Sequence, residues 1–121
     1  MALEIDIRGM LPKENRITKK KEFERIFKKG TGFKEGLLLL RVMPNDSGIS
    51  RFAFIAGLKV SKNATVRNKI KRQLRELTKL QMNNFKKGID AVLIALPGLE
   101  KKEFSEIAII FNNLFKKAKL L

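Results

Sequence analysis

A long amphipathic pattern runs from about residue 65 to residue 80. A helix advances about 100° per residue, which places the apolar residues of this segment on one side and the basic residues on the other. The predicted buried stripe consists of Val66, Ile70, Leu74, Leu77 and Leu80. The opposite side carries Arg67, Asn68, Lys71, Arg72, Arg75 and Lys79. The pattern predicts a helix that packs on a core and presents cations outward.

Apolar periodicity predicts two further helices. A short helix follows Thr18, a candidate N-cap, and ends near Gly30, with apolar residues at Phe23, Ile26 and Phe27. A final helix is predicted over 100–121, where apolar residues recur every three or four positions. These residues are Phe104, Ile107, Phe111, Leu114, Phe115 and Ala118.

Continuous apolar runs predict three strands. The runs at 36–43 and 50–61 flank the turn-like sequence PNDSG, which favours two strands joined as a hairpin. A buried strand is predicted over 88–96. The order of helix, strands, helix, strand and helix indicates an α/β (α+β) sandwich with a single small sheet, in which the basic helix is the crossover between strands. We assign residues 1–10 to an N-terminal extension and 11–121 to a single domain.

The charge of this 121-residue chain is strongly unbalanced. Lysine and arginine total 27 against 12 acidic residues, for a formal net charge of +15. Residues 13–34 contain nine basic and three acidic residues, and residues 59–79 contain eight basic and one acidic residue. A field of this sign attracts polyanions, and the two segments are candidates for one binding surface.

The composition argues against a self-sufficient enzyme. The chain contains no cysteine and no histidine, which excludes thiolate metal sites, a cysteine nucleophile and an imidazole base. Asp90 is the only acid beside a buried segment, and we interpret a lone carboxylate as structural rather than as a general base. No apolar run has the length of a membrane span, so we expect a soluble, cytoplasmic protein with no membrane partner.

Both basic segments allow a structural and a functional interpretation. The cations on the predicted helix could be an ordinary solvated face, but only Glu76 offsets them, which favours nucleic-acid binding. Phe23, Phe27 and Phe33 could belong to the core or could line a cleft for unpaired bases.

Three stretches, in this order, carry a resemblance to a known family. They are LPKENRITKKKEFERIFKKG, VSKNATVRNKIKRQLRE and GIDAVLIALPG. Together they resemble the bacterial ribonuclease P protein component from about Leu11 to the final helix, and the Arg-Asn-x-x-Lys-Arg-x-x-Arg-Glu core is the most specific part.

The resemblance implies a subunit that does not cut by itself. A catalytic RNA, using Mg²⁺, would remove the 5′ leader from precursor tRNA, while the protein would bind both RNAs and no DNA. It implies RNA-binding residues at Arg67, Asn68, Lys69, Lys71, Arg72 and Arg75, and a lysine step before the helix of which Lys59 remains. We add Lys62, which could compensate for the missing lysine of that step. It implies a leader cleft lined by Arg16, Phe23 and Phe27, to which we add Phe33 because it lies in the same basic segment. It also implies a left-handed strand–helix–strand crossover, in a sandwich like one domain of a small-subunit ribosomal protein.

The sequence departs from the family pattern at four positions. Gly57 stands where serine or proline is usual, Leu58 and Leu96 stand where basic residues are common, and Ala91 stands where an aromatic residue is common. A stand-alone RNA-binding module, such as a ribosomal protein, is the alternative function. A small metal-dependent nuclease is a third, which the lack of clustered acids disfavours.

Overall fold

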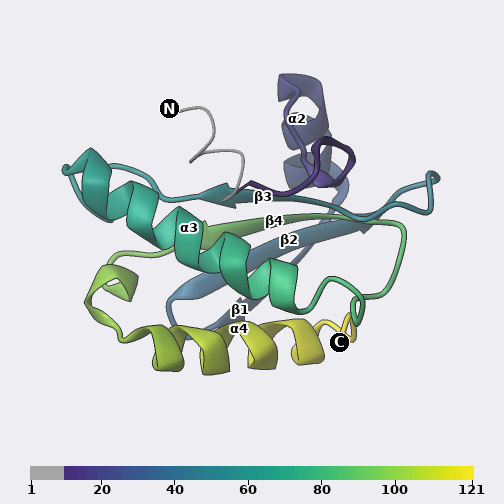
Figure 1. Cartoon of the computed structure of the whole chain (residues 1–121). Helices are drawn as coiled ribbons and strands as arrows, with labels where there is room; N and C mark the ends of the chain where they lie inside the picture. The colour runs from purple at the N-terminus through teal and green to yellow at the C-terminus, as the bar shows by residue number, and fades with distance from the viewer. Residues whose placement is uncertain (1–9) are drawn as a thin grey trace.

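The computed structural model describes residues 10–121 and contains the predicted elements with additions (Figure 1). The elements are η1 (Lys13–Asn15), α2 (Lys20–Lys29), β1 (Thr31–Glu35), β2 (Leu38–Pro44), β3 (Arg51–Ile55), α3 (Ala64–Leu80), β4 (Ile89–Ala95), η2 (Leu99–Lys101) and α4 (Phe104–Lys117), where η marks a 3-10 turn. Apart from Met10, the N-terminal extension predicted over 1–10 lies outside the described residues. No helix within the described range is long and apolar enough to cross a membrane.

The four strands form one mixed sheet in the order β1-β2-β4-β3. Strand β4 pairs antiparallel with β2 and parallel with β3. The predicted hairpin of β2 with β3 is therefore wrong, because β4 lies between them. Strand β4 is buried at every position except Ile94, and such a strand needs a neighbour on each edge and side chains over both faces.

The hairpin that does form joins β1 to β2, and β1 has no counterpart among the predicted strands. Its sequence, TGFKE, is short and mostly polar, as is usual for an edge strand. Gly36 makes the turn with a φ of 54°, a left-handed conformation that favours glycine. The register pairs Glu35 with Leu38 and Thr31 with Val42.

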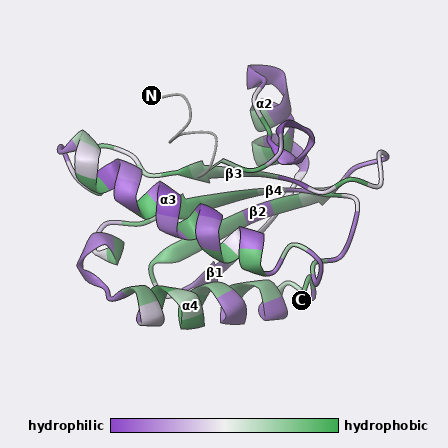
Figure 2. Ribbon diagram, in the orientation of Figure 1, coloured by the Kyte–Doolittle hydropathy of each residue, from purple (hydrophilic) through white to green (hydrophobic). Residues whose placement is uncertain are grey.

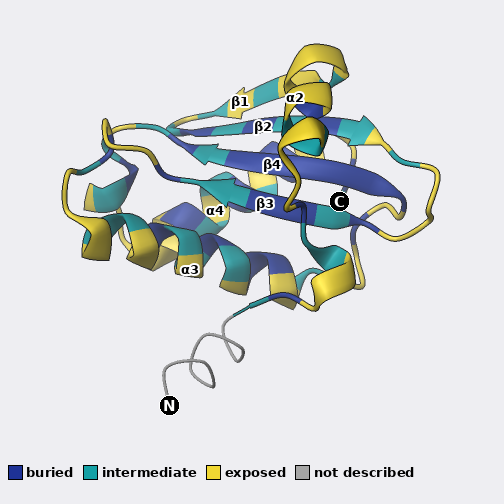
Figure 3. Ribbon diagram, turned by 90° about the horizontal axis from the view of Figure 1, so that it is seen from above, coloured by how far each residue is buried: buried dark blue, intermediate teal, exposed yellow. Residues whose placement is uncertain are grey.

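The connection from β3 through α3 to β4 is left-handed. Figures 1 and 3 show β3 and β4 pointing the same way. From the α2 side, with both strands pointing up, β4 lies to the right of β3 and α3 passes behind the sheet. About 98% of such parallel connections are right-handed. The left-handed crossover implied by the family resemblance is confirmed.

Helices α3 and α4 cover one face of the sheet, and α2 covers part of the other (Figures 1 and 3). In Figure 2 the apolar stripes of α3 and α4 face the strands. The main core lies on this side and includes Leu38, Leu40, Leu74, Leu93, Phe111 and Phe115. A smaller cluster lies under α2 and consists of Ile17, Ile26, Ala53 and Val92. The side of the sheet that carries α2 is left partly open.

The buried stripe of α3 follows the prediction except at its end. Ile70, Leu74 and Leu77 are buried, whereas Leu80 is 72% exposed. Thr78 is buried instead, and its hydroxyl donates to the carbonyl of Leu74 at 2.8 Å. The contact with the core follows the i, i+4 row of side chains, which rotates around the helix and leaves Leu80 in solvent.

The helix ends differ from the predictions by a few residues. The N-cap of α2 is Lys19 rather than Thr18, and the Lys19 N–H donates to the carboxylate of Glu22 at 3.3 Å. Helix α4 begins at Phe104 rather than near residue 100, because 99–101 forms η2. Asn63 caps α3, where its side-chain oxygen accepts from the Thr65 N–H at 2.8 Å.

Candidate nucleic-acid interface

Helix α3 presents the predicted cations at two depths. Asn68, Lys69 and Arg72 are exposed, as are Lys59 and Lys62 in the loop before the helix. The side chains of Arg67, Lys71 and Arg75 are half-buried and lie four residues apart. One row of guanidinium and ammonium groups therefore lies against the protein, while a second row extends into solvent.

The loop before α3 is held in place by the helix itself. Arg67 donates from Nη1 to the carbonyl of Ser61 at 2.9 Å, and the Asn63 N–H donates to the Ser61 hydroxyl at 3.1 Å. These contacts place Lys59 and Lys62 beside the N-terminus of the helix. The loop and the first turns of α3 thus form one cationic surface.

A cleft of about 260 Å³ brings the two basic segments together. Arg16 and Phe23 contribute from the N-terminal segment and α2, Phe54 from β3, and Arg75 from α3. The backbone of the N-terminal segment is held on the sheet at Arg16, which forms a parallel bridge with Phe52 of β3. Phe23 also packs on the small apolar cluster under α2, so its ring belongs both to a core and to a cleft wall.

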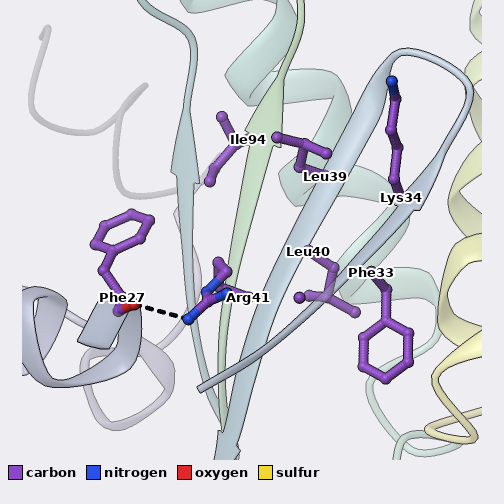
Figure 4. A pocket seen from close by; sticks show the side chains of 8 residues that line it. Phe27, Phe33, Lys34, Leu39, Leu40, Arg41 and Ile94 are labelled. Atoms are coloured by element: carbon purple, nitrogen blue, oxygen red, sulfur yellow. Dashed lines mark hydrogen bonds between the residues drawn. The ribbon is translucent and has the colours of Figure 1, made fainter. Parts of the chain in front are cut away.

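A second, more open cleft of about 450 Å³ lies on the uncovered part of the sheet (Figure 4). Phe27 of α2, 41% exposed, stands at one side, and Leu39 and Ile94 form apolar parts of the floor. Arg41 ties this floor to α2, because its Nη2 donates to the carbonyls of Phe27 at 2.7 Å and Gly30 at 2.8 Å. No local sequence pattern singles out Arg41, because its neighbours in the cleft come from several elements.

Phe33 of β1 lines the same, larger cleft as Phe27 of α2. Their rings lie on opposite sides of Arg41 in Figure 4, and Phe33 also packs against the main core. Of the four predicted cleft residues, Arg16 and Phe23 therefore share the smaller cleft, and Phe27 and Phe33 share the larger one.

Helix α2 is anchored to the sheet by an ion-pair network. Arg51 of β3 donates to both carboxylate oxygens of Asp90, from Nε at 2.9 Å and from Nη2 at 2.7 Å, and also pairs with Glu22 of α2. Asn45 donates to Asp90 as well, at 2.9 Å. The structural role predicted for Asp90 is confirmed.

This network shifts the pKa of both partners of the ion pair between α2 and β3. Burial raises the pKa of the Glu22 carboxyl, but hydrogen bonds from Arg51 and Lys19 and the Arg51 charge outweigh it, so the pKa lies below its ordinary 4.5. The hydrogen bond to Asp90 is the largest cause that raises the pKa of Arg51. The pair is therefore charged at neutral pH and holds Phe23, the next residue, at the cleft.

The residues that line these clefts suit the binding of nucleic acid. Guanidinium groups bind phosphates, and phenyl rings stack on bases. Among residues 10–121, no three His, Cys, Asp or Glu side chains gather in a way that could hold a metal ion.

Comparison with known proteins agrees with this arrangement. The sequence model of the Ribonuclease P family matches residues 11–119. A ribonuclease P protein component from Clostridium acetobutylicum is 40% identical over 111 residues, covering 90% of this chain and 92% of that protein. The RNase P protein of Staphylococcus aureus superposes with a TM-score of 0.82 at 28% identity, covering 88% of this chain and 96% of that one. The RNase P protein of Thermotoga maritima superposes with a TM-score of 0.77 at 27% identity, covering 84% and 96%. The chain therefore belongs to the ribonuclease P protein family, the protein subunit of a ribonucleoprotein endoribonuclease.

Proposed function

We propose that this subunit binds the ribonuclease P RNA through the cationic surface of α3 and holds the 5′ leader of precursor tRNA in the clefts beside α2. Membership of the family makes the ribonuclease P RNA its partner. The proposal adds the residues that contact RNA, the binding of the 5′ leader, and the cytoplasm as the place where the subunit acts. Cleavage is assigned to the RNA, which would use Mg²⁺ for it.

The RNA-binding role of α3 is supported by charge that the protein itself leaves uncompensated. Lys59, Lys62, Lys69 and Arg72 are exposed and form no salt bridge with a described residue. Like charges three or four residues apart repel one another by a few tenths of a kcal/mol per pair, and a polyanion relieves that repulsion. Phosphates of a folded RNA match this surface, because contacts to phosphate require charge but no particular base.

The observation that carries the leader assignment is the meeting of Arg16, Phe23 and Arg75 around one cleft. Arg16 and Phe23 come from one basic sequence segment and Arg75 from the other, and only folding places them together. A single-stranded nucleotide has a charged phosphate and a flat base, which fit a guanidinium and a phenyl ring respectively. The open sheet surface beside Phe27 continues this path over apolar side chains.

The test compares leader-bearing with leaderless tRNA on the reconstituted holoenzyme. Phe23→Ala should weaken binding of precursor tRNA with a leader of several nucleotides by about 5- to 150-fold, which corresponds to about 1–3 kcal/mol of lost stacking. Binding of mature tRNA and of the ribonuclease P RNA should change little. An equal loss for both tRNAs would remove Phe23 from the leader site.

A matched pair of exposed phenylalanines provides the control for general packing effects. Phe27 is 41% exposed and Phe104, on α4 away from both clefts, is 39% exposed. Alanine at either position should lower the melting temperature by a similar amount, because similar apolar area is lost. Only Phe27→Ala should weaken leader binding, and an equal effect of Phe104→Ala would contradict the proposed path.

The alternative of a stand-alone RNA-binding module is not favoured by the comparisons. Cleavage of precursor tRNA by the cognate RNA, measured with and without this protein, separates the two functions. The proposed subunit changes the rate or the substrate affinity of that cleavage, and a stand-alone module leaves both unchanged.

A further inference from the structure

A second group of lysines lies where α3 and α4 end, outside the surfaces described so far. We call it the C-terminal basic surface and define it by Lys86, Lys87, Lys116 and Lys119. Two stretches of similar composition form it, QMNNFKK over 81–87 and NNLFKKAK over 112–119. The sequence contains no acid between Glu76 and Asp90 and none after Glu106.

Two hydrogen bonds connect the first stretch to the second and to Leu120, which follows it, and a third lies within the first stretch. The Lys86 N–H donates to the carbonyl of Leu120 at 2.9 Å. The Gln81 amide donates to the Asn112 side chain at 3.3 Å and accepts from Asn84 at 2.9 Å. Figure 1 shows the C-terminus lying close to the loop that follows α3.

The charge of this surface is exposed and uncompensated within the described part of the chain. All four lysines are exposed, and none pairs with a described carboxylate. Neighbouring lysines differ in this respect: Lys117 pairs with Glu35 at 2.8 Å and Lys102 with Glu106 at 3.9 Å.

Helix dipoles explain only part of the arrangement. A lysine in the last turn of a helix is favourable, which accounts for Lys116. Lys86 and Lys87, however, lie six and seven residues beyond the end of α3.

Lys119 has a φ of 59° and is the only non-glycine residue with a positive φ in the described range. It occupies the position after α4 where glycine is favoured, so the lysine is kept there at a cost in stability.

We propose that the C-terminal basic surface binds the phosphate backbone of RNA as a second contact of this subunit. Lysines bind phosphates, and exposed amides such as Asn83 and Asn84 suit phosphate and sugar oxygens. Helix α3 has 17 residues and is about 25 Å long, so this contact lies about one helix length from the cationic loop before α3. The inference rests on the proposed function, because it adds a second site to a protein that already binds RNA.

The first experiment uses two matched pairs of adjacent lysines. Lys86→Gln/Lys87→Gln removes two charges from the surface. Lys101→Gln/Lys102→Gln removes two charges from the end of η2 and the residue after it, near Glu103 and Glu106. Affinity for the cognate ribonuclease P RNA is measured from 50 to 200 mM salt. Loss of two phosphate contacts should reduce the slope of log affinity against log salt concentration by about 1.4–1.8. The rise in salt should therefore weaken RNA binding by the variant about seven- to twelvefold less than binding by the parent protein. The control pair should keep the parental slope.

The second experiment uses Lys119→Gly, which separates binding from stability. Glycine removes one charge and also relieves the left-handed strain, so the melting temperature should stay the same or rise while RNA affinity falls. A lower melting temperature with unchanged affinity would show a purely structural role and overturn the proposal.

The same measurements identify which RNA supplies the phosphates. A changed slope with the ribonuclease P RNA alone assigns the surface to that RNA, and a change only when the holoenzyme binds mature tRNA assigns it to tRNA. No change in either arm overturns the inference. Arg72→Ala is measured in parallel. If Arg72→Ala weakens RNA binding and the lysine double variant does not, only the proposed second site is contradicted. If Arg72→Ala has no effect, the proposed function itself is contradicted.

Discussion

Substitution of Arg51 tests the network that anchors α2. The guanidinium makes three hydrogen bonds, two to Asp90 and one to Glu22. Arg51→Met keeps much of the side-chain volume but leaves Asp90, whose side chain is only 8% exposed, with Asn45 as its remaining donor. The variant therefore buries a carboxylate without its counter-charge.

The expected loss follows from the burial of the two partners. Removal of one partner of a fully buried ion pair costs about 3–5 kcal/mol. Arg51 is 27% exposed, so water screens the site in part, and Asn45 still donates to Asp90. We therefore expect a loss of about 2–4 kcal/mol, a large share of the roughly 5–15 kcal/mol that stabilises a typical domain. At about 3–5 °C per kcal/mol for a chain of this size, the melting temperature should fall by about 6–20 °C.

The assay is urea unfolding followed by circular dichroism, carried out on single and double variants. Arg51→Met/Asp90→Leu removes both charges and should recover most of the lost stability, since an apolar replacement of a buried pair is often neutral. Two results would refute the reasoning. One is a loss below about 1 kcal/mol for Arg51→Met, which is the value for a surface pair. The other is a double variant whose loss equals the sum of the two single losses.

Three further outcomes follow from individual contacts. Because the pKa of Glu22 is lowered in the folded protein, its ionised carboxylate contributes fully to stability above the ordinary pKa of 4.5, and this contribution is lost as the pH falls through the lower folded pKa. Glu22→Gln should therefore make the unfolding free energy fall less steeply between about pH 5 and 3. An unchanged steepness would contradict this. Gly30→Ala should destabilise the fold by more than about 1 kcal/mol in urea unfolding, because its Cβ would lie 2.5 Å from the carbonyl oxygen of Ile26; full stability would show that the turn can shift. Asn63→Ala removes the cap that accepts from Thr65 and should cost about 0.5–2 kcal/mol by the same assay, whereas Asn63→Ser should cost much less.

Local pattern was sufficient to predict the three helices and the buried strand. Spacing of three and four residues marks the faces of α2, α3 and α4, and the continuous apolar run marks β4. These features depend only on neighbours along the chain, because a helix or a buried strand must place its apolar residues on the side that is covered. The cationic surface of α3 could be predicted for the same reason, since residues opposite a buried stripe must face outward.

Strand order depended on tertiary structure. The sequence favoured a hairpin of β2 with β3, yet β4 inserts between them, and the polar edge strand β1 carried no apolar signal. Pairing across a sheet is decided by which strand most needs covering on both faces, and that competition involves residues up to about half the chain apart. Periodicity along one segment does not contain this information. The left-handed crossover was expected only from the family resemblance, because general topology favours the opposite hand.

The clefts show the same division between chemistry and position. The types of residue, arginine and phenylalanine within basic segments, were apparent in the sequence. Whether Phe23 was core or cleft was not, and the structure places it in both roles. The meeting of Phe27 and Phe33 in one cleft and the recruitment of Arg41 and Phe54 to the clefts depend on the order of the strands and on the position of α2. The sequence by itself determined which groups are available to bind RNA, and only the packing of α2 and α3 on the sheet decided which of them meet, because a cleft is formed by residues that are distant along the chain.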